Sequence, residues 1–133
     1  MGGRSADSGG GSDRFKMPKF TNGSEKQQAW AGRILSGFDD SFTANIKQAT
    51  KNQATFKKRG VPSEAKKFAN DAAALKKARS NYRASAAKQT DAVSIINNRE
   101  RLARGVEGMM RRAIEQSGGT TTRYYDINVN PSR

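Results

Sequence analysis

Apolar residues recur at spacings of three and four along most of the chain, beginning near residue 23. In the first such stretch Trp30, Ile34 and Phe38 lie four residues apart, which places them on one face of a helix. Just upstream, Ser24 and Gln27 have the spacing of a capping box, in which each side chain accepts a hydrogen bond from the other residue's backbone N–H. The pattern predicts a helix that begins directly after Ser24.

We expect this first helix to span residues 25–36 and to stop at Gly37. Residues 39–41, Asp-Asp-Ser, are suited to begin a second helix, because their side-chain oxygens can accept hydrogen bonds from free N–H groups. Apolar positions continue at helical spacing over residues 42–56, and three basic residues followed by Gly60 are typical of a helix end. The sequence therefore predicts a short first helix and a longer second one.

Residues 63–88 predict a third helix with the most regular seam of the chain. Its members follow a strict three-four spacing: Ala65, Phe68, Ala72, Leu75, Arg79, Tyr82 and Ala86. Residues 92–116 predict a fourth helix, capped by Thr90-Asp91. Two asparagines and two glycines weaken its middle, so a break into two shorter helices near residues 98–102 stays open as an alternative.

The two ends of the chain lack this helical pattern. Residues 1–22 are rich in glycine and serine and are predicted to form a disordered arm. An alternative is that the end of this arm packs back onto the helices through Phe15, Met17, Pro18 and Phe20. Residues 118–133 have β-type composition without a strand partner elsewhere, so we expect an extended or disordered C-terminal arm. The predicted fold is all-α: a small basic bundle of three to five helices over residues 23–117, with flexible N- and C-terminal arms.

Composition adds a partner class to this picture. The formal net charge of +13 favours a partner rich in negative charge, above all nucleic acid. Leu, Ile, Val and Phe supply 19 of the 133 residues, which predicts a thin core. Disorder of the whole chain is therefore kept as an alternative to a folded bundle. No apolar run approaches a membrane span and the N-terminus lacks the apolar core of a signal peptide. We therefore expect a soluble protein of the cytoplasm, or of the host cytoplasm if the protein is viral, that does not bind a membrane.

Basic residues cluster along the second and third predicted helices. The candidate nucleic-acid contacts are Lys57, Lys58, Arg59, Lys66, Lys67, Lys76, Lys77, Arg79, Arg83 and Lys88. Such residues neutralise phosphates independently of base sequence, although a solvated Lys-rich helix face is the competing interpretation. Arg79 and Arg83 are the sharpest candidates, because a guanidinium can make bidentate or stacked contacts. A second set of arginines between residues 99 and 112 alternates with glutamates and is interpreted as pairing along a helix.

A separate candidate lies in the C-terminal arm. Arg123, Tyr124 and Tyr125 follow no helical stripe, so they could stack on bases or enter a pocket of a protein partner. The aromatic residues that lie on helical stripes are predicted core residues: Trp30, Phe42, Phe56, Phe68 and Tyr82.

The sequence offers no catalytic constellation. The chain has no cysteine and no histidine, which excludes disulfides, thiolate nucleophiles, imidazole bases and Cys/His zinc sites. The Asp39-Asp40 pair is better explained as a helix cap than as a metal site. We therefore expect a protein that is not an enzyme and has no catalytic residue, metal or cofactor.

Two short segments carry a resemblance. Gly-Ser-Glu-Lys-Gln at residues 23–27, with Trp30-Ala31 and Ile34, resembles a motif in small proteins of bacteriophages and other mobile elements, most of which have no assigned activity. Residues 91–99 are similar to a second segment of those proteins, with Asn97 where they have aspartate and without their aromatic residue. The resemblance covers about 25 of the 133 residues. It implies a viral or mobile-element origin and packing between the two helices.

Three functional hypotheses follow. The first is an accessory protein that binds nucleic acid or a nucleoprotein complex through its basic helical face. The second is a viral inhibitor of a host defence complex, similar to anti-CRISPR proteins, which docks on a host protein such as an RNA-guided nuclease. The third is a structural or assembly protein of a phage that associates through the alanine-rich seam. The sequence leaves the oligomeric state and the choice between DNA and RNA open.

Overall fold

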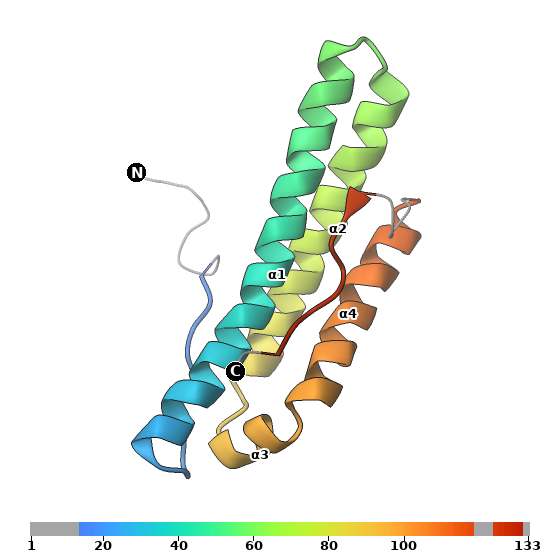
Figure 1. The fold of residues 1–133 in the computed structure, drawn as a ribbon. Helices are drawn as coiled ribbons and strands as arrows, with labels where there is room; N and C mark the ends of the chain where they lie inside the picture. The colour runs from blue at the N-terminus through green and yellow to red at the C-terminus, as the bar shows by residue number, and fades with distance from the viewer. Residues whose placement is uncertain (1–13, 119–123, 132–133) are drawn as a thin grey trace, which may run out of the picture.

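The computed structural model of the chain describes residues 14–118 and 124–131. In these residues it has four helices and no strand, which confirms the predicted all-α bundle of three to five helices. The helices are α1 (Glu25–Lys58), α2 (Pro62–Ala86), α3 (Ala92–Asn97) and α4 (Arg99–Gln116). Figure 1 shows α1 and α2 as a long antiparallel hairpin, with α4 beside its lower part and α3 at the lower end. No helix in this part of the chain has both the length and the apolar character needed to cross a membrane.

Helix α1 is one continuous helix, so the predicted stop at Gly37 and the predicted cap by Asp39-Asp40-Ser41 are wrong. The reason is the apolar stripe, which continues without a break through Ile34, Phe38 and Phe42, all of them at most 1% exposed. Burying each of these side chains contributes about 1.5–3 kcal/mol, more than the 0.5–1 kcal/mol that a glycine costs inside a helix. The burial of this stripe therefore keeps α1 helical across Gly37.

The beginning of α1 follows the sequence prediction. The Ser24 Oγ accepts a hydrogen bond from the Gln27 backbone N–H at 3.2 Å, and Gln27 Oε1 accepts from the Ser24 N–H at 2.9 Å. The capping box is thus confirmed. Next to it, the Asn22 side chain donates to Asp91 Oδ1 at 2.7 Å and accepts from the Ala92 backbone N–H at 2.8 Å. The two segments that carry the resemblance therefore lie side by side, as that resemblance implied.

The predicted fourth helix is divided into two shorter helices, which is the alternative that the sequence left open. Helix α3 ends at Asn97 and α4 begins at Arg99. Asp91 caps α3, because its Oδ1 accepts from the Ser94 backbone N–H at 2.9 Å. The guanidinium of Arg99 lies 5.1 Å from the centre of the Trp30 ring, which is only partly buried. The break thus lets the short α3 and the start of α4 meet the first turns of α1.

Tyr82 is the centre of the aromatic core between α1 and α2. The centre of its ring lies 5.5 Å from the ring centre of Phe42 and 6.3 Å from that of Phe38. Its hydroxyl donates a hydrogen bond to the Leu35 carbonyl at 2.5 Å. The ring of Phe15 stacks on Tyr82 at 6.4 Å. The end of the N-terminal arm therefore packs back onto the helices, the alternative that the sequence had left open.

Residues 124–131 are extended and lie along the bundle, where Figure 1 shows them running between the α1–α2 hairpin and α4. Tyr125, Ile127 and Val129 are buried, while the residues between them are exposed, which is the alternation of an extended chain. Their backbone is held by side chains, since Asn45 bonds both the N–H and the carbonyl of Asp126, at 3.1 and 2.9 Å. This segment completes the core without forming a strand pair.

Candidate nucleic-acid interface

The turn between α1 and α2 carries half of the predicted nucleic-acid contacts. Gly60 has φ of 75°, a left-handed conformation that suits glycine and reverses the chain. Phe56 and Phe68 stack with ring centres 5.5 Å apart and join the ends of the two helices. Glu64 lies among the basic residues and pairs with Lys67 at 3.3 Å. Five basic side chains of this turn are exposed to solvent: Lys57, Lys58, Arg59, Lys66 and Lys67.

Helix α2 places a further set of lysines on its outer side. Lys66, Lys77 and Lys88 are eleven residues apart, which is close to three helical turns, so they form one stripe along α2 and the turn that follows it. All three are exposed, and so is Lys76 on the flank of the stripe. A rise of about 1.5 Å per residue separates neighbouring members of the stripe by roughly 16 Å.

Arg79 and Arg83 lie elsewhere, in the contact between α2 and α1. Arg83 makes a bidentate ion pair with Asp39, with Nε–Oδ1 of 2.6 Å and Nη2–Oδ2 of 3.0 Å. Only 12% of the Arg83 side chain and 8% of the Asp39 side chain are exposed. Arg79 donates to the Thr43 hydroxyl at 3.0 Å. The structure therefore gives both arginines a role between helices, and the phosphate contact expected of them stays a prediction.

The outer face of α1 carries Lys58, which was predicted, together with basic residues that the sequence reasoning missed. Their signal is a spacing of seven, because two turns of a helix return a side chain to almost the same face. Positions 26, 33, 40 and 47 form one set with that spacing, in which position 40 is occupied by Asp40. Positions 51 and 58 form the other set. The exposed basic residues of this face are Lys26, Arg33, Lys47, Lys51 and Lys58.

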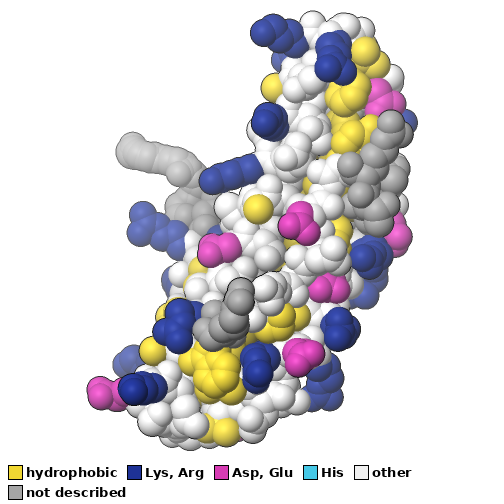
Figure 2. Space-filling view, viewed as in Figure 1, with side chains coloured by type: hydrophobic (Ala, Val, Ile, Leu, Met, Phe, Trp, Pro, Cys, Tyr) yellow, Lys and Arg dark blue, Asp and Glu magenta, His cyan; other side chains and the backbone are white. Residues whose placement is uncertain are grey.

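Acidic residues are few in the hairpin, and two of them are turned away from this surface. Residues 25–88 contain 14 basic and 5 acidic residues. Two of the five, Asp39 and Asp71, are 5% and 1% exposed and accept hydrogen bonds inside the bundle. Figure 2 shows basic side chains around the upper end of the molecule, over the turn between α1 and α2, and down the left edge of the view. Because Arg79 and Arg83 also lie between the helices, the exterior of the hairpin carries 12 exposed basic residues against the three remaining acidic ones, the same excess of positive charge as the sequence count gives.

The two tyrosines of the predicted partner-binding arm pack onto the bundle. The Tyr125 hydroxyl donates to Asp71 Oδ2 at 2.7 Å, and the Ser117 hydroxyl donates to the other oxygen of the same carboxylate. Burial, reinforced by this carboxylate, raises the pKa of Tyr125 well above its usual value. The ring of Tyr124 meets Phe68 edge-on at 4.9 Å. Arg123 lies outside the described residues, and a partner contact through this arm stays a prediction.

Comparisons with known proteins add no relative, because no protein-family model, no curated protein and no solved structure matches the chain. In residues 14–118 and 124–131, no three Asp or Glu side chains converge as the ligands of a metal ion would. The case for a function accordingly depends on the charged surface of the hairpin.

Proposed function

We propose that the protein binds nucleic acid, alone or within a nucleoprotein complex, through the phosphate backbone. The observation that supports this is the exposed basic surface of the α1–α2 hairpin, with two of the hairpin's five acidic residues buried. Most of its cations are lysines, which act as point charges and do not read base edges as a guanidinium fork does. Binding of this kind is independent of sequence and weakens steeply with salt, because each phosphate contact releases counterions.

The length of the hairpin fits several simultaneous contacts. The basic residues of α1 extend from Lys26 to Lys58, about 48 Å at 1.5 Å per residue. Helix α2 runs antiparallel beside α1 (Figure 1), and its exposed lysines extend from the turn to Lys88. A polyanion bound at the turn would meet cations from both helices.

The segments that resemble proteins of bacteriophages and mobile elements lie at the other end of α1. Residues 23–34 and 91–99 are joined by Asn22, which bonds Asp91 and Ala92, and by the contact of Arg99 with the Trp30 ring. Their role in this proposal is to fix the fold from which the basic surface projects. An accessory protein of such an element, acting on its nucleic acid, is the biological setting that we infer.

The proposal is tested by fluorescence anisotropy with short labelled DNA and RNA duplexes over a salt series. We expect the logarithm of the association constant to fall linearly with the logarithm of the salt concentration, with a slope of about −0.9 per phosphate contact on DNA. The double substitution Lys66→Gln and Lys77→Gln removes two exposed charges of the α2 stripe. It should weaken binding at low salt and reduce the slope by about two contacts.

A matched control separates this surface from general attraction to a basic protein. Arg101→Gln with Arg104→Gln removes the same charge from exposed positions in the first half of α4. The control should change affinity much less than the α2 pair. Equal losses in the two variants would contradict a defined interface on the hairpin, and an affinity that does not change between low and physiological salt would contradict phosphate binding altogether.

A further inference from the structure

A pocket of about 200 Å³ opens between α1, α2 and the first half of α4, and no lysine lines it. Its inner wall is apolar and includes Phe38, Tyr82 and Val106. The Tyr82 hydroxyl is turned into the core, where it donates to the Leu35 carbonyl. The pocket thus presents an aromatic and aliphatic surface in a protein whose exterior is otherwise rich in lysine.

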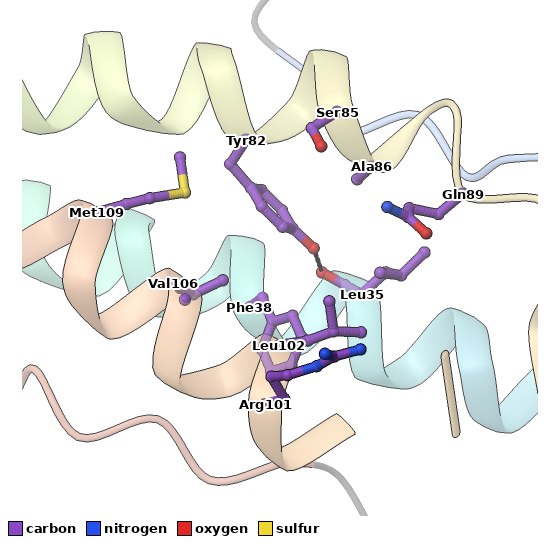
Figure 3. A pocket seen from close by; sticks show the side chains of 11 residues that line it. Leu35, Phe38, Tyr82, Ser85, Ala86, Gln89, Arg101, Leu102, Val106 and Met109 are labelled. Atoms are coloured by element: carbon purple, nitrogen blue, oxygen red, sulfur yellow. Dashed lines mark hydrogen bonds between the residues drawn. The ribbon is translucent and has the colours of Figure 1, made fainter. Parts of the chain in front are cut away.

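The pocket has a polar end and an apolar end. Figure 3 shows Met109 at one end, and Gln89 and Arg101 on opposite sides of the other end. Arg101 is the one charged side chain among the residues that line the pocket. Asn98 Oδ1 accepts a hydrogen bond from the Arg101 guanidinium at 3.1 Å, which restrains the group at this rim. An apolar chamber with a positioned cation at its mouth matches a ligand with an apolar body and an anionic head.

The size of the pocket limits that ligand. An engineered cavity of about 150 Å³ binds benzene, so about 200 Å³ holds one aromatic ring with a short substituent. A ring placed against Tyr82 and Phe38 would have its substituent at the end where Gln89 and Arg101 lie. We propose that this pocket binds a small aromatic carboxylate, with the ring between α1, α2 and α4 and the carboxylate at the Arg101 guanidinium.

Gly105 provides a direct way to fill the pocket. It lies in the pocket wall within α4, and an added Cβ would have no heavy atom of the described residues within 4 Å, leaving out its chain neighbours and the backbone of its own turns. A leucine at this exposed position of the wall is therefore accommodated without displacing the backbone, and Gly105→Leu is designed to cover the pocket. Ala44→Leu, at an exposed position of α1 outside the pocket, is the matched control.

The test uses phenylacetate and its neutral analogue phenylacetamide as probes, with the whole chain labelled at its methionine methyl groups. In two-dimensional NMR, phenylacetate should shift the Met109 methyl resonance more than that of Met17, which is 50% exposed and is not among the residues that line the pocket. The carboxylate should bind about tenfold more tightly than the amide, since a hydrogen bond to a charged group is the stronger one.

Two variants decide between the pocket and unspecific binding. Arg101→Gln should remove the preference for the carboxylate while the amide still binds, and Gly105→Leu should abolish both shifts with helical content unchanged in circular dichroism. If Gly105→Leu loses helical content, the Arg101→Gln comparison alone decides. An unshifted Met109 methyl, equal affinity for the two probes, or an undiminished shift in folded Gly105→Leu would each overturn the proposal.

Discussion

The ion pair between Arg83 and Asp39 allows a quantitative test of how the hairpin is built. Both side chains are almost fully enclosed, at 12% and 8% exposure, and two hydrogen bonds of 2.6 and 3.0 Å join them. This geometry is that of a buried pair, whereas an exposed pair contributes about 0–1 kcal/mol. Asp39→Ala removes the carboxylate and leaves the guanidinium in a dehydrated site. We expect it to lower the free energy of unfolding by about 3–5 kcal/mol.

The double substitution Asp39→Leu with Arg83→Met replaces both charges by apolar side chains. Because no charge then stays buried, the double variant should be close to the wild type or more stable by about 1–4 kcal/mol. Urea unfolding followed by far-UV circular dichroism measures both values. A loss below about 1 kcal/mol for Asp39→Ala would show that the pair behaves like an exposed one, which would refute this account of the hairpin.

The double variant also tests the function of Arg83. If Arg83 acts only between the helices, the folded double variant should bind nucleic acid with unchanged affinity and salt slope. A reduced slope in a variant of normal stability would show that Arg83 contacts phosphate, as its sequence position predicted.

Three further predictions concern single positions. Gly37→Ala should raise the free energy of unfolding by about 0.5–1 kcal/mol in thermal melts, because the described neighbours leave space for the added Cβ. Tyr125→Phe should lower it by about 1–3 kcal/mol in urea, because one oxygen of buried Asp71 loses its donor. The Ser94 backbone N–H, with help from the Asn22 side chain, lowers the pKa of Asp91. Its stabilising contribution is therefore complete above the unfolded pKa of about 3.9 and lost as pH falls through the folded value. Asp91→Asn should accordingly flatten the decline of stability below about pH 4 in acid titrations.

Sequence periodicity was sufficient for the helical class, the capping box and most of the core. Phe42, Phe68 and Tyr82 were predicted core residues and are buried. The helix end at Gly37 was predicted wrongly because the low helix preference of glycine was given more weight than the apolar stripe on either side of it. A glycine changes helix stability by under about 1 kcal/mol, whereas the long-range contacts of that stripe involve residues of α2 that local sequence does not reveal.

The candidate interface shows that a count of charged residues does not reveal which of them reach the surface. The sequence gives the number of cations in the hairpin but not which of them face an acidic partner. Arg79 occupied a position of the apolar seam on α2, and Asp39 lies four residues after Leu35 and three before Phe42 on the stripe of α1, so a signal for inward-facing charges was present. The extended segment was harder, because Tyr125 and Ile127 alternate as in a strand while their partners are side chains of distant helices.

Asp71 gives the folding of the chain a temporal order. Its two hydrogen-bond donors, Ser117 and Tyr125, follow it by 46 and 54 residues. At a synthesis rate of roughly 5–20 residues per second, Tyr125 is added about 3–11 s after Asp71. The α1–α2 hairpin can therefore pair on the ribosome while this carboxylate is still hydrated. The burial of Asp71 can be complete only after the segment downstream of α4 has been made and has packed against it.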